Sequence, residues 1–367
     1  MRVFRLIAIG CGLAVLSLPA QKKKNKEDET QTLQLPKELP NEIAGDTARL
    51  DFAVTPLSAK GLLSQQVRDA LKALQRDSHG GTVLKIRAFV AGSGDLRRVR
   101  DLVSETFTDR KQPLPVLSVI RAGGLPLEGA QVVFEGILED RKEVNPAGLA
   151  FLSSFPATSP NPLDPVAPLT AKALGSLRQS VQASGAEPSD VLRVTCFLSS
   201  LDNFAATRGL VEAEYPRAAP NYVQTQRAPA QALAACEAVV RLRGKGSQPL
   251  GFLAPKGLPQ APGLSAIAMV SAPQVVLTGT QISFGFQERD ARLAFERLAK
   301  SIEQAGASPA NVAFVHYYPL STGLADQVRK IGGEFFSKEH PPAGTMLSFE
   351  GLSAMDAGFA VDVVAVK

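Results

Sequence analysis

The sequence predicts an α+β fold built from three tandem repeats, each with the order strand, helix, strand, helix, strand, strand. Strands of alternating character recur three times, at 83–90, 191–198 and 312–319. An amphipathic stretch precedes each strand and ends at a glycine, namely Gly81, Gly185 and Gly306. A third observation concerns spacing, because each strand is followed by an aromatic residue after the same interval of 17 residues. Three equal intervals of matching character indicate repetition.

The first helix of each repeat is expected directly before its glycine. Apolar residues recur there every three or four positions, which places them on one helical face. These residues are Val67, Leu71 and Leu74, then Leu174, Leu177 and Val181, then Ala294, Leu298 and Ile302.

The second helix of each repeat is expected within the 17-residue interval. The intervals run from Val90 to Phe107, from Leu198 to Tyr215 and from Pro319 to Phe336. A proline follows in every copy, and two strand-like runs then close the repeat. The last run carries an acid each time, namely Glu135, Glu237 and Asp362.

Composition restricts the class of protein. The 367 residues are 45% hydrophobic and 20% charged, which is enough apolar material for real cores and excludes a disordered or fibrous chain. Basic residues number 40 and acidic residues 35, and a net charge of +5 is too small to favour a nucleic-acid partner. Three scattered histidines (His79, His316 and His340) do not form the spacing of a zinc site, so we expect no metal and no cofactor.

The N-terminus has the pattern of a signal peptide over residues 1–20. Arg2 and Arg5 precede a charge-free run at 6–18, and Ala20 offers a small residue for cleavage. The run is too short to span a bilayer as a helix. We therefore expect export to the periplasm or the medium, with no membrane attachment after cleavage. A lipoprotein box at Cys11 and a buried N-terminal helix are the alternatives.

The rest of the chain divides by composition. Residues 21–45 are charged and proline-containing, and they read as a linker. The repeats are then expected at 46–139, 140–246 and 247–367.

The second and third repeats resemble the YjgF/RidA family. The residues that carry the resemblance are Asn145-Pro-Ala-Gly-Leu-Ala-Phe-Leu-Ser153 with Ala183-Ser-Gly-Ala-Glu-Pro-Ser-Asp-Val191, and Val276-Leu-Thr-Gly-Thr-Gln-Ile-Ser283 with Glu303-Gln-Ala-Gly-Ala-Ser-Pro-Ala-Asn-Val312. The first repeat is more divergent and lacks the glycine-rich opening strand. In all, the resemblance covers about residues 46–367.

The resemblance implies a chorismate-mutase-like domain in each repeat. Family members assemble as homotrimers with a central β-barrel, outer helices and clefts between subunits, and many hydrolyse reactive enamines and imines such as 2-aminoacrylate. Three repeats in one chain would accordingly form an intrachain pseudo-trimer with a central barrel. We therefore expect a monomer, because the edges that a homotrimer buries by association would be buried within one chain.

The arginine that the family uses to hold the substrate carboxylate is missing. It stands two residues after the proline that follows the second helix, where this chain has Leu117, Tyr222 and Gly344. An apolar residue cannot replace a bidentate guanidinium. Arg121 and Arg227 lie a few residues further on, and they are the displaced candidates.

The glutamate that the family uses to position water is missing too. Its expected positions hold Val133, Ala235 and Ala360, and the family's opening tyrosine corresponds to Leu264 in the third repeat. We therefore expect no catalytic residues of the family type. The candidate cleft-lining residues are Tyr222, Thr278, Gly279, Glu135, Glu237 and Asp362. For the three acids, the alternative is pairing with a neighbouring cation.

Three further residues have mainly structural interpretations. Cys196 and Cys236 both lie on expected strands of the second repeat. Buried free thiols are the first interpretation, and a disulfide is the alternative in an exported protein. His316 lies on the third repeat's strand, and we expect it in a core or an interface.

Three functions remain open at this stage. The first is a protein that binds a small metabolite in clefts between repeats, without the family's arginine-dependent chemistry. The second is an enamine or imine deaminase of the RidA type that works with displaced groups. The third is a scaffold or chaperone-like interaction protein, for which the cleft positions would be filled by side chains.

Overall fold

The computed structural model describes residues 36–259 and 261–367. The expected signal peptide and most of the expected linker therefore lie outside the described residues. The linker nevertheless ends earlier than expected, because β1 (Glu42–Asp46) is a strand that pairs with the third repeat. The expectation was wrong here because polar composition does not reveal that the backbone of this segment finds a free sheet edge.

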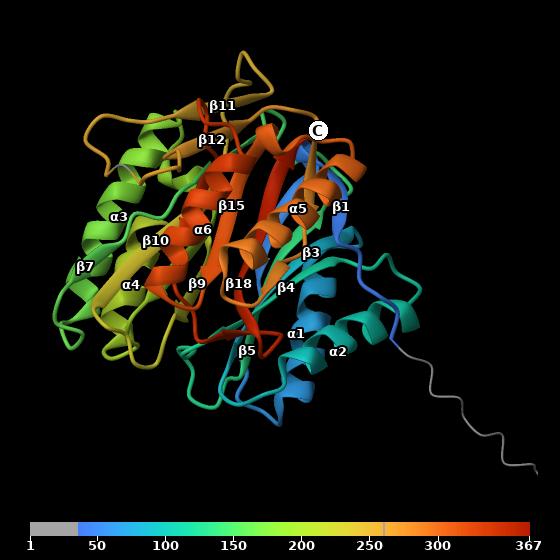
Figure 1. Cartoon of the computed structure of the whole chain (residues 1–367), viewed down its shortest axis with the longest axis vertical. Helices are drawn as coiled ribbons and strands as arrows, with labels where there is room; N and C mark the ends of the chain where they lie inside the picture. The colour runs from blue at the N-terminus through green and yellow to red at the C-terminus, as the bar shows by residue number, and fades with distance from the viewer. Residues whose placement is uncertain (1–35, 260) are drawn as a thin grey trace, which may run out of the picture. The chain divides into compact units, whose positions relative to one another are not determined.

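Each repeat supplies two helices and one sheet (Figure 1). The first repeat contains β1, η1 (Thr47–Arg49), β2 (Leu50–Val54), α1 (Leu63–Asp77), β3 (Thr82–Ala91), α2 (Leu96–Asp109), β4 (Val116–Ala122) and β5 (Val132–Glu139). The second contains β6 (Leu149–Leu152), β7 (Ala157–Ser159), α3 (Val166–Ala183), η2 (Pro188–Asp190), β8 (Val191–Leu198), α4 (Phe204–Glu214), β9 (Ala219–Gln224) and β10 (Ala232–Arg241).

The third repeat is the longest. It contains β11 (Leu250–Leu253), β12 (Ile267–Val270), β13 (Gln274–Thr278), β14 (Gln281–Phe284), α5 (Glu288–Gln304), η3 (Pro309–Asn311), β15 (Val312–Pro319), α6 (Thr322–Phe335), β16 (Ala343–Met346), β17 (Gly351–Leu352) and β18 (Ala357–Val366). In the described part of the chain, no helix is long and apolar enough to cross a membrane.

One strand arrangement recurs in all three repeats. The strand after the first helix pairs in parallel with the strand after the second helix, so β3 lies beside β4, β8 beside β9 and β15 beside β16. On its other side the same strand pairs antiparallel with the last strand, which is β5, β10 or β18. The α+β class and the three related units are thereby confirmed.

The first helices pack as their sequence pattern predicts. All nine residues expected on their inner faces are buried. Gly185 and Gly306 have positive φ at the ends of α3 and α5, as expected of glycines that stop a helix. In the first repeat the positive φ falls at His79 and Gly80 rather than at Gly81, so that helix stops slightly earlier than predicted.

Strands are exchanged between neighbouring repeats. β1 of the first repeat adds to the sheet of the third by pairing with β13, and β12 of the third adds to the second by pairing with β6. The segment at 140–144, which leads into the second repeat, bonds back to the first, so each repeat exchanges backbone contacts with a neighbour. There the amides of Asp140 and Val144 donate to the carbonyls of Arg49 and Ala48 in the first repeat, both at 2.8 Å.

The expected closed barrel is not found among the described strands. They form three separate mixed sheets, and β17 of the third repeat is the edge strand of the first repeat's sheet, next to β4. Side chains fill the space between the sheets instead of continuous backbone pairing. A helix–sheet core serves each repeat, and two further apolar clusters draw residues from all three repeats. One of these contains Phe89, Phe197 and Phe349, whose ring centroids lie about 6 Å apart.

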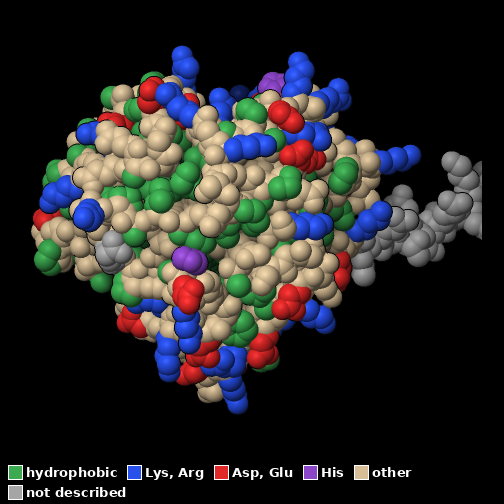
Figure 2. Space-filling view, turned by 90° about the horizontal axis from the view of Figure 1, so that it is seen from above, with side chains coloured by type: hydrophobic (Ala, Val, Ile, Leu, Met, Phe, Trp, Pro, Cys, Tyr) green, Lys and Arg blue, Asp and Glu red, His purple; other side chains and the backbone are tan. Residues whose placement is uncertain are grey.

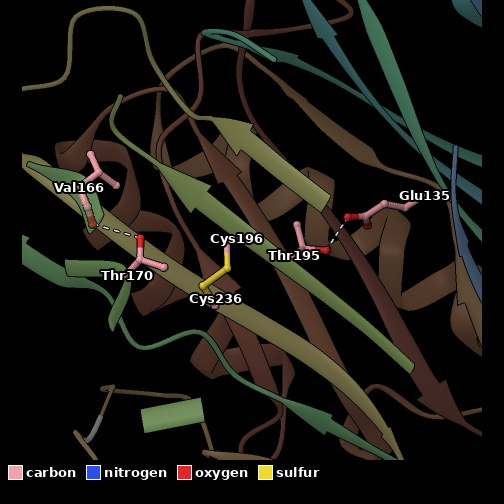
Figure 3. The surroundings of a disulfide bond; sticks show 6 residues. All are labelled: Glu135, Val166, Thr170, Thr195, Cys196 and Cys236. Carbon is pink, nitrogen blue, oxygen red and sulfur yellow. Dashed lines mark hydrogen bonds between the residues drawn. A yellow bond between two sulfur atoms is a disulfide. The ribbon is translucent and has the colours of Figure 1, made fainter. Parts of the chain in front are cut away.

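Cys196 and Cys236 form a disulfide that joins β8 to β10 (Figure 3). The two residues are direct antiparallel partners, with Cα atoms 4.1 Å apart. The interpretation of free thiols was therefore wrong, and the alternative is correct. The adjacent Thr195 points to the opposite face of β8, where it bonds Glu135.

Candidate functional site

Three clefts lie between neighbouring repeats, and we name each by one lining residue. The Tyr222 cleft, of about 290 Å³, lies between the second and first repeats. The Met346 cleft, of about 390 Å³, lies between the third and second. The Leu117 cleft, also of about 390 Å³, lies between the first and third. Each is lined by the strand after the second helix of one repeat and by residues near β2, β7 or β14 of its neighbour.

Strand pairing shows that the three positions counted from a proline do not lie at one level. Leu117 and Gly344 pair with Ile86 and Val315, and the residue of the second repeat at their level is Pro220, which pairs with Val194. Tyr222 pairs two residues further along, at the level of Val119 and Met346. The difference arises because the proline of the second repeat lies within β9 rather than before it. Neither level holds an arginine in any of the three repeats.

The third of these positions is closed to any larger side chain. A Cβ on Gly344 would overlap the carbonyl oxygen of Val315 and would lie 3.3 Å from Leu264, the residue expected at the place of the family's opening tyrosine. The Gly344 amide donates to Ser153 of the second repeat at 2.7 Å. At the first position, the Leu117 carbonyl accepts from Thr280 of the third repeat at 3.3 Å. These positions hold neighbouring repeats together.

The displaced arginines do not reach the clefts. Arg121 donates to the carbonyls of Gly92 and Gly94, which fixes the loop before α2. Arg227 faces Glu350 at 3.9 Å. Neither residue is among those that line the three clefts.

Tyr222 has the features of a ligand-contacting residue. Its side chain is 7% exposed, and among the described residues its hydroxyl has no hydrogen-bond partner. Its ring meets Phe204 edge to face with centroids 4.9 Å apart. Burial raises the pKa of Tyr222 to about 12, with a smaller contribution from Glu212. The hydroxyl is therefore a neutral donor at physiological pH.

The rest of the Tyr222 cleft is mainly apolar. The first repeat contributes Val54, Leu57 and Val133, and Val133 stands where the family's glutamate was expected. Arg208 and Glu212 of α4 line the same cleft, but they pair with each other at 2.6 Å and are largely exposed. Their charges cancel locally, so the cleft holds no uncompensated cation.

The other two clefts carry charged groups from second helices. Arg329 of α6 lines the Met346 cleft and bonds Asp326 at 2.7 Å. Arg97 and Arg100 of α2 line the Leu117 cleft together with Asp101. Figure 2 shows basic and acidic side chains interspersed over one face of the molecule.

The remaining candidate residues divide between the clefts and the interior. Gly279 lines the Leu117 cleft. Thr278 does not line a cleft, because it is fully buried and its hydroxyl accepts from the Val363 amide at 3.0 Å. Glu135, Glu237 and Asp362 are also fully buried, and they lie in the interior rather than along the three clefts.

The three acids form a central charged cluster with cations of other strands. Arg87 Nη2 lies 2.5 Å from Glu135 Oε2 and 2.5 Å from Glu237 Oε1, which joins two repeats. Lys85 Nζ lies 2.5 Å from Asp362 Oδ1 of the third repeat. His316 is buried here, as expected of a core residue. Its Nδ1 lies 3.0 Å from Asp362 and its Nε2 lies 3.1 Å from Glu237.

Charge attraction outweighs burial at these carboxyls. Burial alone would raise the pKa of Glu237, but Arg87 and His316 hold it well below its usual range. Asp362 behaves likewise, because Lys85 and His316 overcome the effect of burial on its pKa. The sequence analysis did not assign Lys85, Arg87 or Arg193 to this cluster. Their signal was available, since all three are charged residues at alternate positions within strands that read as buried.

The comparisons with known proteins concern the fold alone. No family model and no curated protein matches the sequence. Solved structures of the YjgF/RidA family do match. A Rid-family protein of unknown function from Yersinia pestis has 17% identity and a TM-score of 0.30, over 33% of this chain and 100% of its own. A YjgF-family member from Mycobacterium tuberculosis has 21% identity and a TM-score of 0.24, over 32% and 99%. Escherichia coli TdcF with bound serine has 19% identity and a TM-score of 0.23, over 25% and 80%. Each match spans at most one third of this chain.

Proposed function

We propose that this protein binds a small neutral metabolite in the Tyr222 cleft, without the arginine-dependent deaminase chemistry of the YjgF/RidA family. The observation that carries the proposal is the Tyr222 hydroxyl, a buried donor without a partner among the described residues, in an otherwise apolar cleft between two repeats. A buried unpaired polar group is costly, and a ligand acceptor would satisfy it.

The cleft favours a particular class of ligand. Its volume of about 290 Å³ is near the lower end for small-molecule sites. Apolar walls and the edge-to-face Phe204 ring suit a flat or aromatic body. A carboxylate would need a cation, yet Arg208 is paired with Glu212. The ligand should therefore be uncharged and should carry one carbonyl or similar acceptor for Tyr222.

Binding can be tested by calorimetry with a panel of neutral aromatic amides and, separately, of amino-acid carboxylates. Tyr222→Phe should weaken binding of the best amide about 2- to 13-fold, which is the effect of one hydrogen bond. Tyr215→Phe is the matched control, because its hydroxyl is equally unpartnered and it belongs to the same apolar cluster, but only Tyr222 lines the cleft. Equal effects of the two substitutions would contradict the proposal. Absence of any small-molecule binding would favour the scaffold alternative.

The deaminase alternative is tested separately by imino-acid hydrolysis. Loss of a charge-assisted arginine contact typically costs ~2–5 kcal/mol, or about 30- to 4,000-fold. We expect hydrolysis of 2-aminoacrylate at the background rate, because the positions counted from each proline hold Leu117, Tyr222 and Gly344, and Pro220 at the level of Leu117 and Gly344 is not an arginine either. Robust hydrolysis by the unmodified protein would overturn this expectation. It would favour the deaminase alternative, with the cleft-lining arginines of the second helices in place of the missing one.

Export and assembly complete the proposal. The N-terminal pattern supports an exported protein, and a buried disulfide suits an oxidising compartment. Sequencing of protein from its native host should begin near Gln21, and an intact Met1 on cytosolic protein would contradict export. The cyclic exchange of strands among the repeats supports an intrachain pseudo-trimer.

A further inference from the structure

A small cavity lies inside the central charged cluster, apart from the three clefts. Its volume is about 20 Å³, which is room for one water-sized occupant. All three repeats line it, through Lys85 and Arg87 of the first, Arg193 of the second and His316 of the third. Four apolar side chains and Glu135 complete the lining.

Hydrogen-bond donors around this cavity are in excess. Arg193 is 5% exposed, so its guanidinium is buried beside this cavity. Its Nη1 and Nη2 lie 3.5 Å from Glu135 and 3.7 Å from Glu237, and its Nε has no partner. Arg87 Nη1 is likewise unpartnered in the described part of the chain. A buried guanidinium in this state requires an acceptor.

Acceptors in the lining are already occupied. Glu135 accepts from Thr195 and Asn221 on one oxygen and from Arg87 on the other. Both nitrogens of His316 face carboxylates. Oε2 of Glu237 lacks a donor among the described residues, but Glu237 does not line the cavity. A water molecule here would accept from the arginines yet find no acceptor for its own hydrogens.

The charged groups of the cluster are already engaged with one another. Lys85, Arg87 and Arg193 face three carboxylates. His316 lies between Asp362 Oδ1 at 3.0 Å and Glu237 Oε1 at 3.1 Å, so neither of its ring nitrogens is left to serve as an acceptor for the arginines.

We propose that the central cavity binds one monatomic anion of chloride size, held by Arg193 and Arg87 between the three repeats. A monatomic anion accepts every free donor and brings no hydrogens that need partners. The cavity has room for one water-sized occupant, which is too little for sulfate, phosphate or a carboxylate. The ion would act as a structural ligand that neutralises the junction of the three sheets.

Bromide is the direct probe of this site. Protein unfolded and refolded in sodium bromide should give crystals with one anomalous peak within hydrogen-bond distance of the Arg193 and Arg87 side chains. Ordinary water density without anomalous signal at that position would overturn the proposal, and so would an empty cavity.

Chloride should also be linked to folding. Above its dissociation constant, an ion that binds only the folded state lowers the unfolding equilibrium constant about tenfold for each tenfold rise in concentration. We expect this slope in sodium chloride when sodium gluconate holds the ionic strength constant, because gluconate is too large for the cavity. An unchanged unfolding constant would contradict the proposal.

Arg193→Met should abolish the chloride slope, whereas Arg178→Met, at an exposed surface pair, should retain it. If Arg193→Met does not fold, the bromide peak and the chloride slope of the unmodified chain decide the question.

Discussion

Arg87 offers the sharpest test of how the three repeats are held together. Its guanidinium contacts Glu135 of its own repeat and Glu237 of the next, in a cluster with almost no solvent exposure. Arg87→Met keeps most of the side-chain volume but leaves two buried carboxylates facing Arg193, whose nitrogens are 3.5 and 3.7 Å away. Breaking a buried pair from one side typically costs 3–5 kcal/mol. We expect a loss of about that size in the free energy of unfolding.

Urea denaturation followed by circular dichroism measures this loss, since the sequence has no tryptophan. Arg178→Met is the matched control, because its pair with Glu214 lies at the surface and should be worth at most about 1 kcal/mol. Adding Glu237→Gln to Arg87→Met removes one of the two stranded charges and should recover part of the loss. If Arg87→Met costs no more than the control, the cluster does not stabilise the assembly of the repeats.

Four further predictions concern the same fold. Stability should fall as pH drops below about 4.5, because Glu237 and Asp362 have depressed pKa values in the folded state, and acid titration of the unfolding free energy measures this. Burial raises the pKa of all four tyrosines, so at pH 10.5 the folded protein should show under about 5% tyrosinate absorbance, against about 75% in the unfolded chain. Stability should fall in parallel above pH 10. Replacing Cys196 and Cys236 together by alanine removes the cross-link that closes a loop of 40 residues in the unfolded chain. The free energy of unfolding, measured by urea denaturation, should fall by about 4 kcal/mol. Light scattering should report the mass of one chain, and a stable trimer of chains would contradict the intrachain pseudo-trimer.

Local features of the fold could be predicted from the sequence. The spacing of apolar residues and the position of a glycine located α3 and α5 together with their buried faces. Both features depend only on residues a few positions apart in the chain. Alternation located the strands and the recurring acids. These features depend on neighbours in the chain, which a sequence records directly.

Partners across repeats could not be predicted. Lys85 and Asp362 are 277 residues apart, and Arg87 and Glu237 are 150 apart. Both pairings depend on how three sheets face one another. The strand level of Tyr222 could not be predicted for a related reason, because it is set by pairing with Cys196 and not by distance from a proline. The strand role of β1 was missed because its partner lies in the third repeat.

Joining three repeats in one chain has a physical consequence at the centre. Identical subunits around an axis would bring three copies of the same side chain together, and three arginines at the level of Arg87 would repel one another. In this chain that level holds Arg87, Thr195 and His316, which follow equivalent strand positions. Arg87 can therefore meet the acid of the next repeat, while Thr195 bonds Glu135 and His316 bridges Glu237 and Asp362. The same freedom applies to the clefts, since the level that holds Tyr222 in the second repeat holds Val119 and Met346 in the others.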